Sequence, residues 1–189
     1  MNKKRVIDKA FSIPGLYSRP DAELLVNLAR RDGELVELGC YKGRTTALIL
    51  QACQDKGGRL TSIDPFIQPS AKYEAATAEM WRNNLQRVGL KPPRLLEMTG
   101  DEAFEQFEGK ALSFVFIDAS HAYEAVLNDL RRWTPLLKVG GVVALHDMYH
   151  PGIHGVCQAV ADWFSAAAHN QFRWLDQQGL TIAFERRQA

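Results

Sequence analysis

Acidic and histidine side chains follow several short apolar runs of this sequence, at the point where each run ends. Asp64, Asp118 and the adjacent pair His146–Asp147 each come directly after such a run. If the runs are parallel strands, their carboxyl ends meet at one edge of a sheet, where open α/β sheets bind their ligands. Carboxylate and imidazole groups there can orient a hydroxyl, move a proton or ligate a metal. The spacing therefore predicts a chemically active crevice at that edge.

A glycine-rich turn follows the first of these runs. Within Glu37-Leu-Gly39-Cys-Tyr-Lys-Gly43, two glycines let the backbone turn sharply and approach a ligand closely. The spacing differs from the G-x-G-x-x-G of dinucleotide folds and from the P-loop. Asp64 lies 21 residues beyond Gly43, at the tip of the next strand, where a carboxylate can accept both hydroxyls of a ribose. Together these features predict an adenosine-containing cofactor.

Strand-like and helix-like segments alternate along the chain and would position these groups. We expect strands over 34–38, 59–63, 95–98, 113–117, 142–145, 172–175 and 180–185. We expect helices over 21–31, 45–53, 71–88, 102–107, 123–137 and 155–168. Asp21 is the expected N-cap of the first helix, and Gly140–Gly141 are expected to turn the chain into the strand at 142–145. The alternation predicts an α/β fold with a doubly wound, mostly parallel sheet, closed by a hairpin of the last two strands.

The composition limits the class of protein. Lys and Arg total 23 against 22 for Asp and Glu, so no concentrated basic surface is indicated and we expect no nucleic-acid partner. Three cysteines without a CxxC pair predict neither a disulfide framework nor a zinc knuckle. No apolar stretch approaches the roughly 20 residues that cross a bilayer. We therefore expect a cytoplasmic protein with no membrane partner.

Four motifs resemble those of one large family, the class I S-adenosylmethionine-dependent methyltransferases. The string VELGCYKG at 36–43 is similar to their first motif and is close to the catechol O-methyltransferase branch. The strings FIDASHAY at 116–123, LKVGG at 137–141 and LHD at 145–147 look like bacterial small-molecule O-methyltransferases. The resemblance covers roughly residues 20 to 185.

The resemblance implies a Rossmann-like seven-stranded sheet and a single methyltransferase domain, residues 1–189. An N-terminal helical segment, 1–30, would precede a catalytic core, 31–189. The implied cofactor is S-adenosylmethionine, and the implied reaction is methyl transfer to a hydroxyl of a small-molecule acceptor. Little chain precedes the core, so the acceptor pocket is either open or completed by a second subunit of a homo-oligomer.

The resemblance also assigns cofactor-binding residues. Glu37 would face the methionine end of the cofactor, while Gly39, Tyr41 and Gly43 would line it through backbone contacts. Asp64 would bind the ribose. The alternative for both acids is a solvated strand end.

A further cofactor contact is implied after the third expected strand. Gly100 and Asp101 match the position at which the family contacts adenine. The alternative is an ordinary helix start, with Asp101 as the N-cap.

On the acceptor side, the resemblance implies a base and a metal site. His121 follows Asp118 at the spacing of the D-x-x-K of catechol-type enzymes, so His121 and Asp118 are the catalytic candidates. An imidazole, with an ordinary pKa of about 6.5, suits proton removal at neutral pH. The alternative is that His121 only caps the next helix.

Asp118, His146 and Asp147 fall where the metal-dependent branch places its ligands. That branch usually has Asp-Asn where this chain has His146-Asp147, and hard Mg²⁺ prefers oxygen ligands. One imidazole and two carboxylates better suit Mn²⁺, Fe²⁺ or Zn²⁺. The alternative is a pair that binds substrate without a metal.

Other aromatic and histidine residues have open roles. His150 and His154 follow His146 at intervals of four, but Pro151 and Gly152 predict a loop that contacts substrate rather than a helical metal site. Phe66, Tyr73 and Trp81 could form the wall of an acceptor pocket. For Trp81, packing of an amphipathic helix on the core is an equally good explanation.

Two other classes of protein stay open. A non-catalytic S-adenosylmethionine-binding module would need the glycine turn and Asp64 but no acid–histidine cluster. An NAD-dependent oxidoreductase would share the strand-tip acid but would need G-x-G-x-x-G, which is absent from the turn at 37–43.

Overall fold

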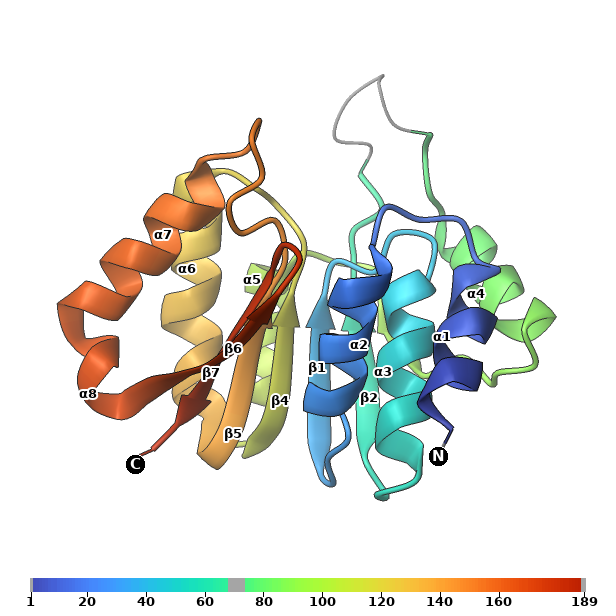
Figure 1. Ribbon diagram of the computed structural model, residues 1–189, viewed down its shortest axis with the longest axis horizontal. Coiled ribbons are helices and arrows are strands. Elements are labelled where there is room, and N and C mark those ends of the chain that lie inside the picture. Colours follow the sequence, from blue (N-terminus) through green and yellow to red (C-terminus); the bar gives the residue numbers. More distant parts are fainter. Residues whose placement is uncertain (1, 68–73, 188–189) are drawn as a thin grey trace.

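A seven-stranded sheet forms the centre of the computed structural model, which describes residues 2–67 and 74–187 (Figure 1). The strands are β1 (Glu34–Leu38), β2 (Arg59–Ile63), β3 (Arg94–Leu96), β4 (Leu112–Ile117), β5 (Leu137–Leu145), β6 (Phe172–Gln178) and β7 (Thr181–Arg186). The longer helices are α1 (Lys3–Phe11), α2 (Arg19–Leu28), α3 (Arg44–Gln54), α4 (Ala78–Arg87), α5 (Gly100–Phe104), α6 (Tyr123–Trp133) and α7 (Gly155–Trp163). Short helical segments follow as η1 (Glu105–Phe107), η2 (Thr134–Leu136), η3 (Phe164–Ala168) and α8 (His169–Gln171).

The strand order is β3-β2-β1-β4-β5-β7-β6. The first five strands pair in parallel, whereas β7 pairs antiparallel with both β5 and β6. The chain starts at the middle of the sheet, builds outward to β3, and then returns to build the other half. This arrangement confirms the predicted Rossmann-like, doubly wound, mostly parallel sheet with a closing hairpin.

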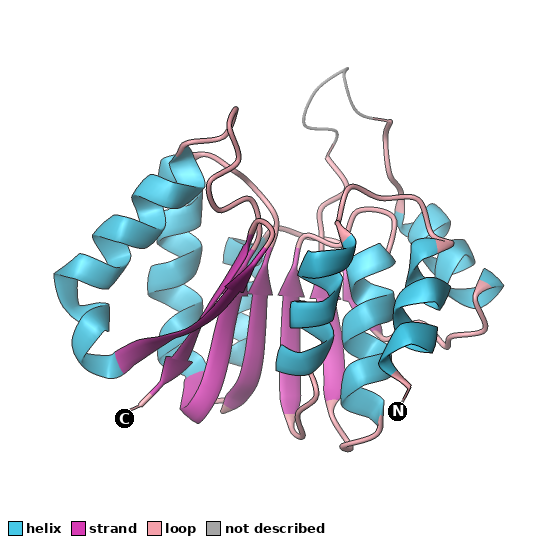
Figure 2. Cartoon of the chain, in the orientation of Figure 1, coloured by secondary structure: helices cyan, strands magenta, loops and turns pink. Residues whose placement is uncertain are grey.

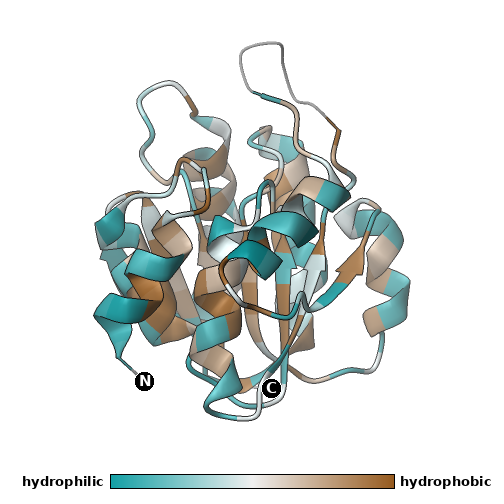
Figure 3. Cartoon of the chain, turned by 90° about the vertical axis from the view of Figure 1, so that its right-hand side faces the viewer, coloured by the Kyte–Doolittle hydropathy of each residue, from teal (hydrophilic) through white to brown (hydrophobic). Residues whose placement is uncertain are grey.

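Helices cover both faces of the sheet and bury two separate apolar cores (Figure 2). In β4, Phe114 and Phe116 face the core under α1–α4, while Val115 and Ile117 face the core under α5–α7. The alternation follows because successive side chains of a strand point to opposite faces. Figure 3 shows hydrophobic residues on the strands and inner helix faces, with hydrophilic residues outside.

Strand β5 corrects one sequence expectation. Gly140 and Gly141 do not turn the chain into a strand at 142, because β5 already begins at Leu137. Gly140 has a positive φ of 79°, and the pairing of β5 with β4 shifts register in this region. The two glycines therefore form an irregularity within a continuing strand, as expected of a β-bulge.

The N-terminal segment also differs from expectation. Helix α1, over Lys3–Phe11, lies within the helical segment expected over 1–30, for which only the helix from Asp21 has expected bounds. Helix α2 begins before Asp21, because Ser18 is its N-cap and accepts a hydrogen bond from the Asp21 backbone N–H at 3.4 Å. Asp21 therefore lies inside the helix, and its side chain is free to make contacts elsewhere.

Several other boundaries move by a few residues. The helix expected over 71–88 starts at Ala78 with Thr77 as its N-cap; 74–77 are not helical, and 71–73 lie outside the described residues. The strand expected at 95–98 spans Arg94–Leu96. The hairpin turn is shorter than expected, since residues 176–178 pair with β7 and extend β6. The helix expected to reach 168 ends at Trp163 and continues as the π-helical η3.

The loops after β1, β2, β4 and β5 gather at the carboxyl edge of the sheet, at the top of Figure 1. Four non-glycine residues with positive φ lie in these loops: Tyr41, Phe66, Asp147 and Tyr149. Such backbone strain concentrates where a fold holds functional groups in place. Among the described residues, no helix is long and apolar enough to cross a membrane.

Candidate active site

The glycine turn after β1 fits against the end of β4. Gly39 has a φ of 82°, and a Cβ on it would lie 2.1 Å from the backbone oxygen of Asp118. Gly43, with a φ of 94°, is the N-cap of α3. Both positions need glycine because a side chain would meet backbone strain, and at Gly39 also a backbone atom. The close approach joins the predicted cofactor turn directly to the predicted catalytic strand end.

Asp64 holds this turn through backbone hydrogen bonds. Its Oδ2 accepts from the backbone N–H groups of Cys40 at 2.8 Å and Tyr41 at 2.9 Å. Its Oδ1 accepts from the Phe66 N–H at 2.7 Å. The carboxylate is therefore an organiser of the loops after β1 and β2. Ribose binding by Asp64, and backbone contacts from Tyr41, stay predictions.

Glu37 lies beneath the turn and is completely buried. Its Oε1 accepts from the Thr45 hydroxyl at 2.7 Å, and its Oε2 accepts from Thr46 at 2.7 Å and Ser62 at 2.6 Å. Burial raises the pKa of Glu37 to about 7, although the three hydroxyl groups oppose the shift. Glu37 is thus not a solvated strand end, and its contact with the methionine end of a cofactor stays a prediction.

Sequence reasoning missed the hydroxyl groups that hold Glu37. A signal for two of them was present, because adjacent threonines open the helix eight and nine residues after Glu37. Thr46 also accepts a hydrogen bond from Trp81 Nε1 at 2.9 Å. Trp81 is therefore a core residue and does not wall a pocket.

The segment after β3 begins a helix in a different way from the alternative considered. The N-cap of α5 is Thr99, which forms a capping box with Glu102, so Asp101 is not the cap. The Asp101 carboxylate accepts from Asn128 Nδ2 at 2.6 Å and lies 3.5 Å from Arg132 Nη1. Adenine contact by Gly100 and Asp101 stays a prediction.

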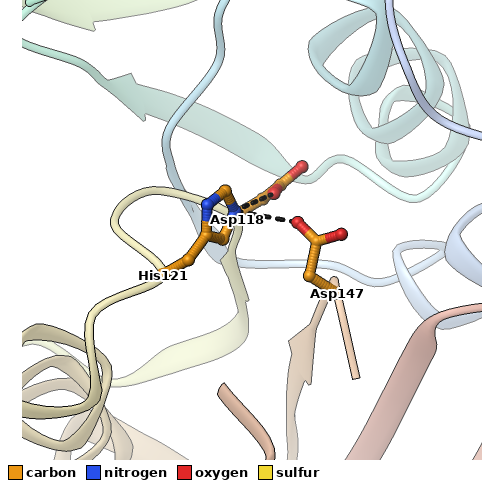
Figure 4. Close-up of side chains that lie close together, drawn as sticks. All are labelled: Asp118, His121 and Asp147. Atoms are coloured by element: carbon orange, nitrogen blue, oxygen red, sulfur yellow. Dashed lines mark ion pairs between the residues drawn. The ribbon is translucent and has the colours of Figure 1, made fainter. Parts of the chain in front are cut away.

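The acid–histidine residues of the acceptor side come together in one cluster (Figure 4). His121 Nε2 lies 2.8 Å from Asp147 Oδ2 and 3.8 Å from Asp118 Oδ1. The side chain of His121 is 40% exposed, against 23% for Asp118 and 12% for Asp147, so the cluster opens to solvent through the imidazole. The alternative that His121 only caps the next helix is wrong, because Ala122 is the N-cap of α6.

Backbone packing places His121 in this position. A Cβ on Gly155, at the start of α7, would lie 2.3 Å from the His121 backbone oxygen and 2.7 Å from the Tyr123 nitrogen. Only glycine lets α7 approach the loop after β4 so closely. Asp147 is held by its left-handed φ of 59° at the end of β5.

His146 completes the cluster from the buried side. Its Nδ1 lies 3.6 Å from Asp118 Oδ1 and 3.5 Å from Asp147 Oδ2. Its side chain is only 8% exposed. The cluster therefore contains two carboxylates and two imidazoles, which can balance each other in charge.

These contacts shift the pKa values of all four groups. Hydrogen bonds to Asp118 and Asp147 raise the pKa of His121 to about 9. Burial lowers the pKa of His146, but the same two carboxylates outweigh it and raise the value to about 10. Burial likewise opposes ionisation of the carboxyls, yet the imidazoles hold the pKa values of Asp118 and Asp147 below their ordinary range. Without a ligand, both imidazoles are therefore protonated at neutral pH, and His121 must lose a proton before it can accept one.

The cluster also offers ligand atoms for a metal. One oxygen or nitrogen from each of Asp118, His121 and Asp147 lies within 4.8 Å of the others. This group shares both carboxylates with the set expected from sequence, and the expected His146 lies against the same two oxygens.

The loop after β5 contains the remaining histidines. His150 Nδ1 accepts from the Gly152 N–H at 3.1 Å within the loop, and His154 precedes α7. The structure confirms a loop rather than a helix across these positions. Phe66 is partly buried against the core beneath α1–α4, and Tyr73 lies outside the described residues.

The fold and this edge define a class I methyltransferase: a glycine turn after β1, acids at the tips of β2 and β4, and a closing antiparallel hairpin. The methyltransferase-domain family matches residues 36–148, which is more than half of the chain. The chain belongs to that family.

Solved structures with the same fold cover nearly the whole chain. Cofactor-bound Rv0187 from MTB matches with a TM-score of 0.70 at 18% identity, covering 99% of this chain and 88% of that one. The O-methyltransferase from Bacillus cereus in complex with SAH gives 0.65 at 17% identity, covering 97% and 90%. SAH-bound PaMTH1 from Podospora anserina gives 0.64 at 13% identity, covering 98% and 88%. At these identities the similarity establishes the fold, and the substrate must be inferred from the residues of the site.

Proposed function

We propose that this chain transfers the methyl group of S-adenosylmethionine to a hydroxyl of a small-molecule acceptor. The observation that carries the proposal is the cluster of Asp118, His121, His146 and Asp147, which lies beside the glycine turn. The SAH-bound relatives from B. cereus and P. anserina support the choice of cofactor, and the former supports the hydroxyl acceptor.

The cofactor side would bind the methyl donor between two acids. Asp64 already organises the turn and would accept the ribose hydroxyls, while Glu37 supports the floor under the methionine end. Gly100 and Asp101 would lie toward the adenine. A cationic sulfonium fits a rim whose acids, Asp64, Asp118 and Asp147, follow β2, β4 and β5.

Methyl transfer from a sulfonium is an in-line displacement. A bond forms between the acceptor oxygen and the methyl carbon, and the carbon–sulfur bond gives its electron pair to sulfur, which leaves as S-adenosylhomocysteine. The enzyme mainly holds the two reactants in line and removes the hydroxyl proton. Asp118 and Asp147 would orient the acceptor, and the neutral form of His121 would take the proton.

A divalent cation fits the donor set of this cluster. The carboxylates of Asp118 and Asp147 and the imidazoles of His121 or His146 would hold it, and the mixed oxygen and nitrogen ligands favour Mn²⁺, Fe²⁺ or Zn²⁺ over Mg²⁺. When bound, such a cation lowers the pKa of the acceptor hydroxyl and displaces protons from the imidazoles. The alternative of acceptor binding without a metal uses the same four side chains.

Calorimetric titration of S-adenosylhomocysteine and of NAD, each with and without Mg²⁺ or Mn²⁺, tests the proposal. We expect binding of S-adenosylhomocysteine and none of NAD. Transfer of a labelled methyl group to a panel of phenols, catechols and sugars then tests the reaction. Binding without transfer to any acceptor would favour the non-catalytic module, and binding of NAD instead would indicate an oxidoreductase.

The acceptor pocket would be open or completed by a second subunit. Light scattering tests the second arrangement, since a monomer under assay conditions contradicts a homo-oligomer. A small-molecule acceptor, with no nucleic acid or membrane as partner, is part of the same proposal.

A further inference from the structure

Three buried polar residues outside the family match lie behind His146. Tyr17 precedes α2, Asp21 is in α2, and Thr181 begins β7. Their exposed fractions are 4%, 1% and 0%. All three fall outside residues 36–148, so they come from the N-terminal segment and the closing hairpin rather than from the matched core.

Tyr17 packs directly on the imidazole of His146. The two ring centroids are 4.6 Å apart with an interplanar angle of 44°. The tyrosine ring is itself fixed, because it packs edge-to-face with Phe116, with 6.0 Å between ring centroids, and its hydroxyl pairs with Thr181 Oγ1 at 2.7 Å. A ring held on one face by a fixed aromatic neighbour has little freedom to tilt.

Asp21 faces the other nitrogen of the same imidazole. Its Oδ1 lies 4.0 Å from His146 Nε2. The same oxygen accepts from the Leu180 N–H at 2.8 Å and from the Thr181 hydroxyl at 2.9 Å, while Oδ2 accepts from Ser18 Oγ. These hydrogen bonds leave the buried carboxylate no freedom to rotate away.

The hairpin turn is shaped to admit this carboxylate. A Cβ on Gly179 would lie 2.5 Å from Asp21 Oδ1, so the turn must be glycine for Asp21 to reach its partners. The hairpin is tied to the site as well, because the Met148 N–H donates to the Leu180 oxygen at 2.9 Å. The N-terminal segment, the hairpin and the end of β5 therefore form one connected unit.

We propose that Tyr17 and Asp21 are positioning residues that hold the His146 ring so that its Nδ1 faces Asp118 and Asp147. An imidazole rotated by half a turn would present carbon to the two carboxylates. Tyr17 sets the plane of the ring, and Asp21 favours the N–H edge at Nε2. At 4.0 Å the contact is an ion pair and not a hydrogen bond, so Asp21 acts through the attraction between its carboxylate and the Nε2 edge of the ring.

This inference rests on the proposed function only for the chemical role of the cluster. The positioning of His146 by Tyr17 and Asp21 does not depend on that role. It makes the N-terminal segment part of the acceptor side, through two residues that are buried behind His146. The NMR signals of His121 can report a change in the orientation of His146, because both imidazoles contact Asp118 and Asp147.

NMR of the chain labelled with ¹³C and ¹⁵N in its five histidines tests the proposal, with the His146 signals assigned by His146→Gln. In the wild type we expect a rigid His146 ring, with an order parameter of about 0.85, and in Asp21→Asn and Tyr17→Leu a fall below about 0.6. The His121 signals should shift in both variants. Tyr17→Phe keeps the ring contact, so the order parameter of the His146 ring should be close to that of the wild type and above that of Tyr17→Leu.

The matched control is Thr134→Val, which removes a buried hydroxyl that donates to the Leu130 oxygen at 2.7 Å, away from the site. It should leave both histidines unchanged. Unchanged His146 order in Asp21→Asn and Tyr17→Leu overturns the proposal, and so does an equal loss of order in Thr134→Val. If Asp21→Asn does not fold, the Tyr17→Leu and Tyr17→Phe pair decides. Titrating S-adenosylhomocysteine into the same samples keeps the two questions separate, because a wild type that fails to bind rejects the function while the NMR still decides the positioning.

Discussion

The two halves of the carboxyl edge are built in different ways. In the cofactor half, after β1 and β2, the acids Glu37 and Asp64 are held by neutral groups, hydroxyls for the first and backbone N–H groups for the second. In the acceptor half, after β4 and β5, charged groups hold one another: two carboxylates face two imidazoles. In the proposed function, the first half would bind the cofactor, and the second is a set of groups that can exchange protons.

The two halves also differ in how far apart along the sequence their residues lie. The partners of Glu37 and Asp64 fall between residues 40 and 66. The acceptor half joins Tyr17, Asp118, His146 and Thr181, which are far apart in sequence. A substitution in the cofactor half should therefore change cofactor affinity or stability, whereas one in the acceptor half should change turnover.

The largest effect is expected where the halves meet. Gly39→Ala would place a Cβ 2.1 Å from the Asp118 oxygen in a strained backbone, and we expect it to destabilise the fold by more than about 4 kcal/mol. Gly109→Ala is the control, because its φ of 73° is similar but no atom of residues 2–67 or 74–187 lies within 4 Å of the added Cβ. The control should lower the free energy of unfolding, measured in urea, by about 1–2 kcal/mol. Equal losses for the two variants would show that the close approach of the halves does not matter.

His121→Ala should separate turnover from binding. Loss of a general base lowers the rate by about 10²- to 10⁴-fold, while the affinity for S-adenosylhomocysteine should stay within about twofold of the wild type. His169→Ala, on the exposed α8, is the matched control. Methyl transfer to an acceptor found in the panel is the measurement, and an unchanged rate removes His121 from the base role.

Glu37→Gln should change the pH dependence of stability. The pKa of Glu37 is raised from 4.5 to about 7 in the folded chain, so its stabilising contribution is complete below pH 4.5 and is lost as the pH rises through 7. At about 1.4 kcal/mol per pKa unit, the wild type should lose about 3 kcal/mol more than Glu37→Gln across this range. Urea unfolding without cofactor measures both chains. Parallel curves would mean that Glu37 ionises normally despite its burial.

Asp64→Asn should have the smallest effect, confined to the cofactor half. With its oxygen toward Cys40 and Tyr41, the amide keeps both hydrogen bonds from the turn and loses the one from the Phe66 N–H, and the ribose would lose its charged partner. We expect the affinity for S-adenosylhomocysteine to fall about tenfold, or about 1.4 kcal/mol. Calorimetry checks the affinity, and the NMR signals of His121 and His146 should not move. A shift of those signals would show that the halves are coupled.

Much of the fold could be predicted because its signals are local. Apolar strands such as 113–117 and amphipathic helices such as 45–53 carry their periodicity in a few consecutive residues. Two of the failures share one cause, since tertiary contacts overrode a local signal. Gly140 lies within β5 because Leu137 before it and Val142 after it both pair with β4, and Asp21 looked like a helix cap but reaches across to the hairpin.

The sequence by itself determined the alternation of strands and helices, the glycine turn, and which residues end the parallel strands. Chain order is enough for these, because parallel strands bring their carboxyl ends to one edge. Only the tertiary structure decided that Glu37 is sealed under three hydroxyls, that His121 and His146 share two carboxylates, and that Tyr17 and Asp21 lie behind His146. The physical reason is that hydrogen bonds and charges act over a few ångströms in space, whatever the separation along the chain.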